Sequence, residues 1–103
     1  MTGPGLTFGK PVIAEMVRLA AFEVPGVQDV GRAGPRWRRL FLAPAVGIRV
    51  RDGKVTVRLA IVARPGQALP PLVAAVQAAI GGTVERLLGL ELEAVSVVVD
   101  GVG

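Results

Sequence analysis

The stretch VGIRVRDGKVTVRLAIVAR (residues 46–64) decides the fold, because apolar and polar residues alternate on both sides of one turn signal. Asp52-Gly53 between alternating segments is a strong indication of a two-residue β-hairpin turn. With that turn, Arg51 opposes Lys54 and Ile48 opposes Val57. A slip by one residue would exchange the two faces of the hairpin, so the alternation also fixes its register.

The predicted hairpin has one apolar face and one basic face. The apolar face carries Val46, Ile48, Val50, Val55, Val57, Leu59 and Ile61. The other face carries Arg49, Arg51, Lys54, Thr56, Arg58, Ala60, Val62 and Arg64. A half-buried sheet turns its apolar side chains toward the core. We therefore expect the basic face to stay open.

A helix is predicted before the hairpin, in PVIAEMVRLAAFEV (residues 11–24). Pro11 suits the first helical position, where its missing N–H costs nothing. Apolar residues recur at helical spacing and form a stripe for burial: Ile13, Met16, Val17, Ala20 and Val24. Proline at position 25 ends this helix, and a short strand from Val27 to Val30 follows.

A second helix is predicted after the hairpin, from Pro70 or Pro71 to about Leu88. Its apolar stripe consists of Leu72, Val73, Val76, Ile80, Val84, Leu87 and Leu88. Gly81 and Gly82 weaken it by about 1 kcal/mol each relative to alanine. The last strand, LEAVSVVVDG (residues 92–101), turns Val95, Val97 and Val99 inward and Ala94, Ser96, Val98 and Asp100 outward.

These elements predict an α+β fold with the order α-β-β-β-α-β. Both helices can cover one face of a small mixed sheet of about four strands, which gives a two-layer sandwich. The length of 103 residues suits one domain. We expect residues 1–10 to form a tail or a short strand at Leu6–Phe8. Residues 11–103 then form the domain, with an irregular basic loop at 31–45.

The composition argues against most enzyme chemistry. The sequence has no cysteine and no histidine, which removes thiolate nucleophiles, the commonest general base and the commonest metal ligands. We therefore assign no catalytic, cofactor-binding or metal-ligating residue. No apolar run reaches the ~20 residues that span a bilayer. The N-terminus MTGPGLTFGK has no pattern of a signal peptide, so we expect a cytoplasmic protein.

Charge is distributed unevenly along the chain. Residues 32–64 hold nine basic residues and one acidic residue, whereas the remainder holds three basic and seven acidic residues. Such a dipolar chain suits an acidic partner, a nucleic acid, an anionic membrane or a copy of itself.

Three blocks of the sequence resemble the alkaline shock protein family, also called the envelope stress response or Gls-type general stress family. They are PVIAEMVRLAAFEVPGV, VRDGKVTVRLAIVARPGQALPPLVAAVQAAI and VERLLGLELEAVSVVVDGV. The resemblance implies a small non-catalytic α/β domain in the cytoplasm, linked to cell-envelope homeostasis in Gram-positive and related bacteria. It also implies a membrane-protein anchor as partner, homo-oligomers, or both. Arg58 departs from the family pattern, in which this strand position is often acidic.

The open face is the first candidate site. Ala60, Val62 and Val98 form an aliphatic strip between its charges, and an apolar centre with a charged rim is typical of a protein interface. The plainer interpretation is a solvated face whose arginines guard the strands. The face has no aromatic residue for base stacking, so nucleic acid is disfavoured. An RNA- or nucleotide-binding module that uses residues 32–64 remains the alternative function.

The second candidate site is RWRRLFL (residues 36–42) in the irregular loop. Trp37 and Phe41 could lie at the level of lipid headgroups, with Arg36, Arg38 and Arg39 on anionic lipid or on a partner. The alternative is a loop that folds onto the core as a lid.

Overall fold

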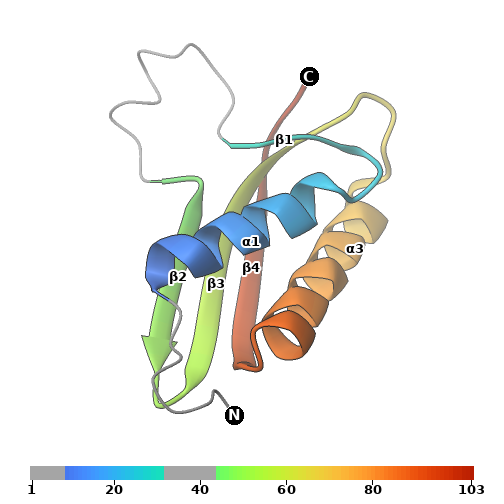
Figure 1. Ribbon diagram of the computed structural model, residues 1–103. Helices are drawn as coiled ribbons and strands as arrows, with labels where there is room; N and C mark the ends of the chain where they lie inside the picture. Colours follow the sequence, from blue (N-terminus) through green and yellow to red (C-terminus); the bar gives the residue numbers. More distant parts are fainter. Residues whose placement is uncertain (1–8, 32–43) are drawn as a thin grey trace.

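The computed structural model describes residues 9–31 and 44–103 (Figure 1). Their elements follow in the order α1 (Lys10–Phe22), β1 (Val27–Val30), β2 (Val46–Arg51), β3 (Lys54–Ala63), α3 (Leu69–Gly82), η1 (Thr83–Leu87) and β4 (Glu91–Val102). This order confirms the predicted α+β fold. The predicted short strand at Leu6–Phe8 and most of the predicted loop at 31–45 lie outside the described residues.

The hairpin between β2 and β3 has the predicted register. Arg51 pairs with Lys54, and Ile48 pairs with Val57. Asp52 and Gly53 both have positive φ, at 53° and 75°. That combination is required by a type I′ turn, whose twist matches the twist of the two strands.

Strand β3 is the centre of a mixed sheet. Strand β4 pairs in parallel with β3 along the whole length of β3, from Lys54 to Ala63. The antiparallel strands β2 and β1 share the other edge of β3, with β2 on its first part and β1 on Ile61–Ala63. Between the two paired parts of β3, the backbone of Ala60 makes two hydrogen bonds. Its N–H donates to the Ala45 carbonyl, and its carbonyl accepts from the Gly31 N–H.

Helices α1 and α3 cover one face of this sheet (Figure 1). Helix α1 buries Ile13, Val17 and Ala21, and α3 buries Leu72, Val76 and Ile80. These side chains pack on the inward residues of β3, which are Val55, Val57, Leu59, Ile61 and Ala63. The inward valines of β4 are partly buried against the same core, as the alternation predicts.

The second helix departs from the prediction at its end. It is α-helical only to Gly82 and continues as the π-helix η1. The Leu88 N–H donates to the Thr83 carbonyl, five residues back, at 3.2 Å. The wider π turn changes which side chains face the core, so Val84 and Leu88 are buried whereas Leu87 is 67% exposed. The predicted burial of Leu87 is therefore wrong.

Val50 also departs from its predicted place under the helices. Its side chain is on the inward face but is 41% exposed. It lies on the outer strand next to the hairpin turn, whereas its partner Val55 on the central strand β3 is fully buried.

Candidate functional site: the open face of the sheet

The open face is the side of the sheet that α1 and α3 leave uncovered. From the strand registers and the alternation of side chains, it carries Arg49, Arg51, Lys54, Thr56, Arg58, Ala60, Val62, Ala94, Ser96 and Val98. These candidate residues of β2, β3 and β4 thus lie on one face of the sheet. Arg64 is exposed in the turn after β3, where its backbone N–H donates to the Gly26 carbonyl.

Pairing across the sheet arranges the open face in rows. The row nearest the hairpin turn is Arg51, Lys54 and Glu91, and a row further along is Gly47, Arg58 and Ser96. In the intervening row, the Thr56 hydroxyl donates to the Glu93 carboxylate at 3.2 Å.

The positive charges of the open face are only partly balanced. The Lys54 ammonium lies 3.7 Å from the Glu91 carboxylate. Within residues 9–31 and 44–103, Arg49, Arg51 and Arg58 make no ion pair. Three guanidinium groups are therefore available to an acidic partner on one exposed surface.

Small residues around Arg58 create a hollow in the open face. Its volume is about 240 Å³, and it is lined by Pro44, Ala45, Gly47, Arg58, Leu59, Ala60, Ser96 and Val98. A second hollow of about 270 Å³ adjoins it at Gly47 and Arg58 and extends to Arg49 and Thr56. Gly47 is the residue of β2 directly opposite Arg58, so no side chain faces the arginine at that position. The face can therefore accept a protruding side chain next to a cation.

The predicted aliphatic strip is only partly accessible. Val98 is 52% exposed, and Val62 is half-buried. Ala60 is 3% exposed, so its predicted place on the accessible surface is wrong. Alternation assigns a residue to a face of the sheet, but the exposure of a single methyl group depends on what surrounds it. Val98 is thus the main apolar contact that the strip offers.

The second candidate site, with Arg36, Trp37, Arg38, Arg39 and Phe41, lies outside the described residues. Its docking on a membrane or a partner stays a prediction.

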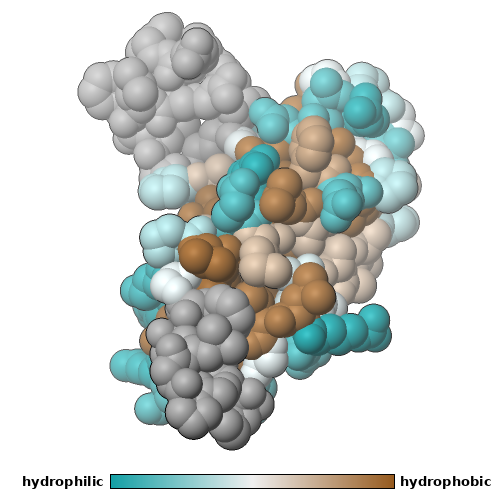
Figure 2. All heavy atoms as spheres, viewed as in Figure 1, coloured by the Kyte–Doolittle hydropathy of each residue, from teal (hydrophilic) through white to brown (hydrophobic). Residues whose placement is uncertain are grey.

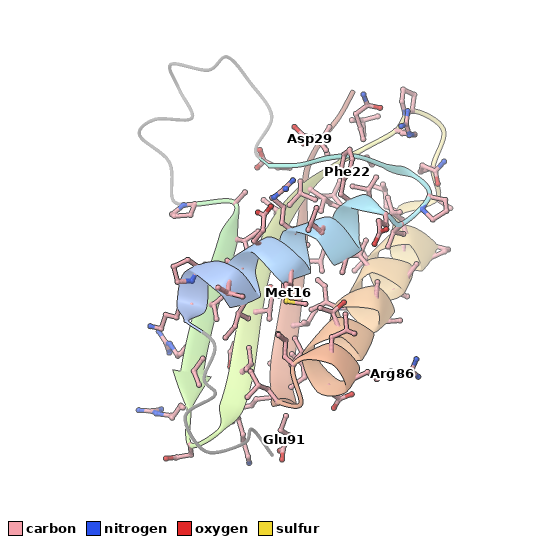
Figure 3. All side chains as sticks on the ribbon, in the orientation of Figure 1. Met16, Phe22, Asp29, Arg86 and Glu91 are labelled. Carbon is pink, nitrogen blue, oxygen red and sulfur yellow. The ribbon has the colours of Figure 1, made fainter. Side chains whose placement is uncertain are left out.

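A further exposed apolar surface was missed by the sequence analysis. Val12, Leu19 and Phe22 lie on the outer side of α1 and are each nearly half exposed. Figure 2 shows apolar atoms reaching the surface along this side of the molecule, and Phe22 lies at the C-terminal end of α1 (Figure 3). The seven-residue spacing of Val12 and Leu19 was the available signal, because it places them on one side of the helix.

Helix α1 carries an exposed ion pair. Arg18 donates two hydrogen bonds to the Glu15 carboxylate, at 2.8 and 2.7 Å. These bonds lower the pKa of Glu15 and raise the pKa of Arg18. The pair lies on the helix layer rather than on the open face, so it is an ordinary surface ion pair of a helix.

The fold of this chain also occurs in solved structures of other proteins. Solved structures with a similar fold include a variant MamM CTD in a manganese form, at TM-score 0.64 and 21% identity, covering 90% of this chain and 99% of that chain. A copper form of the MamM CTD has TM-score 0.65 and 20% identity, with coverages of 89% and 85%. At such identities the likeness shows the fold alone.

The family model is more specific. The chain belongs to the alkaline shock protein 23 family, which is described as having a cell envelope-related function, and the match spans residues 4–103. This finding confirms the resemblance to alkaline shock proteins. No curated protein matches the chain.

The MamM structures are named for the metals of their forms. The sequence has neither histidine nor cysteine. Among the described residues, no three acidic side chains come together in a way that could hold a metal ion.

Proposed function

We propose that this chain is a non-enzymatic interaction domain that acts at the inner face of the cell envelope. In this proposal, its open face binds a protein partner of the envelope. The observation that carries the proposal is the hollow next to Arg58, with further guanidinium groups beside it on the same face. The cell envelope-related function of the family supports the location.

The open face has the anatomy of a modest protein interface. A partner side chain in the hollow would contact Ala45 and Val98, and a carboxylate beside it would reach Arg58. Apolar anchoring supplies affinity, whereas charge complementarity mainly supplies specificity and rate of encounter. An acidic partner segment with a large apolar side chain fits both features.

A membrane-protein anchor is the partner that best suits an envelope location. Within residues 9–31 and 44–103, no helix is both long enough and apolar enough to cross a bilayer. In this proposal, contact with the membrane runs through a partner bound to the open face.

The alternative, an RNA- or nucleotide-binding module, has less support. Sheet surfaces that bind single strands offer aromatic side chains for base stacking. Among the described residues Phe22 is the sole aromatic, and it lies on α1 rather than on the open face. The arginines alone offer phosphate contacts without selectivity.

Site-specific photo-crosslinking in the native cell tests the proposal. A photoreactive residue in place of Ser96, on the open face, should crosslink to one envelope protein. The same residue in place of Ala75, exposed on α3, should not. Arg58→Glu should abolish the Ser96 crosslink, whereas Arg86→Glu on the helix side should leave it intact. A crosslink to nucleic acid, or one insensitive to Arg58→Glu, would contradict the proposal.

A further inference from the structure

The open face presents its arginines in consecutive rows. Neighbouring rows on one face of a sheet are two residues apart along each strand, which is about 6.5 Å. Arg51 stands in the row next to the hairpin turn, Arg49 in the next row, and Arg58 in the row beyond it. One row further along lies Val98, which lines the hollow. An occupant of this face therefore meets three cations in succession and then an apolar hollow.

The spacing of these rows matches the repeat of an α-helix. A helix rises about 1.5 Å per residue, so residues four apart lie on one side of it, about 6 Å from each other. Carboxylates at positions i, i+4 and i+8 of a helix can therefore face three successive rows. An apolar side chain at i+12 then faces the hollow. The long, flexible side chains of arginine accommodate the small difference between the two repeats.

The face of a sheet cannot satisfy the backbone of a second segment. Backbone N–H and C=O groups of the strands bond to each other within the sheet, and side chains project above it. An extended segment laid over the open face would lose water from backbone groups that find no partner there, which is costly. A helix satisfies its backbone internally. The opposite face is already covered in this way, by α1 and α3 (Figure 1).

Charge limits where such a helix can lie. In the part of the chain that the structure describes, none of the three arginines makes an ion pair. Strand β4 instead brings two carboxylates to this end of the sheet. Glu91 lies 3.7 Å from Lys54, and Glu93 accepts a hydrogen bond from Thr56. Acidic side chains of a partner are therefore attracted toward β2 and β3 and repelled from the first part of β4. A helix about 10 Å wide covers two strands that are about 4.8 Å apart.

We propose that the open face binds an acidic amphipathic α-helix of its partner. The helix lies over β2 and β3. Its carboxylates, one turn apart, face Arg51, Arg49 and Arg58, and a large apolar side chain one turn further enters the hollow. This inference rests on the proposed function and specifies the conformation and the residue pattern of the partner segment.

Two synthetic peptides of identical composition test the helix. Each has about twenty residues, long enough to form a helix, with three glutamates and one phenylalanine among alanine and glutamine. The helix-spaced peptide has glutamate at i, i+4 and i+8 and phenylalanine at i+12. The strand-spaced peptide has them at i, i+2, i+4 and i+6. Each is also made in reverse order, because a helix fits the rows in either direction. Titration of the full chain at low salt should show about tenfold tighter binding of the helix-spaced peptide in one direction. Circular dichroism should show that this peptide gains helix on binding.

Exchange of charges between protein and peptide is the sharper test. Arg49→Glu and Arg58→Glu should each weaken binding of the helix-spaced peptide by about three- to tenfold, because an attraction becomes a repulsion. Lysine in place of the middle glutamate of the peptide should restore binding to Arg49→Glu but not to Arg58→Glu. A loss of folding could not produce this selective recovery. Arg86→Glu makes the same charge change on the helix side, so it should bind like the wild type.

Three outcomes would overturn the helix: a helix-spaced peptide that binds no better than the strand-spaced one, binding that Arg49→Glu leaves unchanged, or a bound peptide that gains no helix. The Ser96 crosslink separates this inference from the proposed function. A crosslink that Arg58→Glu abolishes, together with equal peptide affinities, would remove the helix and leave the proposed function intact. A preference for the helix-spaced peptide without a crosslink in the cell would remove the envelope partner and leave the helix.

Discussion

The two faces of β3 share one backbone but have opposite surroundings. Its inward residues Val55, Val57, Leu59 and Ile61 are at most 2% exposed beneath α1 and α3. Its outward residues Thr56, Arg58 and Val62 lie on the open face, and Arg58 is exposed. Burial of apolar surface is the main favourable term in folding. The comparison indicates that the covered face supplies stability, whereas the open face can change its charge at little cost.

Truncation of a covered residue should have the largest effect. Ile61 is fully buried at the centre of the core. We expect Ile61→Ala to lower the free energy of unfolding by about 2–5 kcal/mol, through lost transfer energy and the cavity left behind. Urea denaturation at equilibrium measures this change.

Val62→Ala is the matched control on the open side of the same strand. Val62 is only half-buried, so its truncation should cost clearly less than that of Ile61. Equal losses in the free energy of unfolding for the two variants would contradict the conclusion that the covered face supplies more stability than the open face.

A substitution at the end of α3 should make the protein more stable, because α3 belongs to the layer that covers the sheet. Gly82 is the last residue of α3, with helical φ and ψ of −61° and −43°. An added Cβ would meet no atom within 4 Å. Gly82→Ala should therefore raise the free energy of unfolding by about 0.5–1 kcal/mol, because alanine loses less backbone entropy.

Gly53→Ala provides the contrast for that measurement. Its added Cβ would also meet no atom within 4 Å, but its φ is +75°. Alanine at such a φ is strained, so this variant should be destabilised.

A loss of stability in Gly82→Ala would contradict the first expectation. It would mean that the transition from α-helix to π-helix itself needs the glycine.

Most of the fold was predictable from local pattern. Alternation around Asp52-Gly53 determined both the pairing and the face of each hairpin residue, because side-chain direction in a strand has a strict period of two. The stripe Leu72, Val76 and Ile80 was predictable because a regular helix repeats every 3.6 residues.

The departures occur where that regularity fails or where neighbours decide exposure. The π turn at residues 83–87 is not encoded in a 3.6-residue pattern, so Leu87 was placed wrongly. The basic residues of the open face were predicted, but the hollow at Arg58 was not. It depends on Gly47 and Ser96, which stand beside Arg58 only after β2, β3 and β4 are paired.

Charge reversal at the centre of the open face should scarcely change stability. Arg58 is exposed and makes no ion pair within the part of the chain that the structure describes. We expect Arg58→Glu to change the free energy of unfolding by no more than about 0.5 kcal/mol. Urea denaturation alongside Ile61→Ala measures it. A loss comparable with that of Ile61→Ala would show that the open face is part of the stabilising structure.

The smallest effect belongs to the ion pair on α1, outside both faces of the sheet. Hydrogen bonds from Arg18 lower the pKa of Glu15 below its ordinary value of 4.5. A lowered pKa in the folded state stabilises the protein above the unfolded-state pKa, and this stabilisation is lost as pH falls through the folded-state pKa. Arg18→Gln should therefore lower the melting temperature slightly at neutral pH, and the difference from the wild type should vanish in acid. Thermal unfolding across that pH range measures the difference, with Arg86→Gln as an exposed control that should show no such convergence. A difference that persists after Glu15 is protonated would mean that Arg18 stabilises α1 by packing rather than by charge.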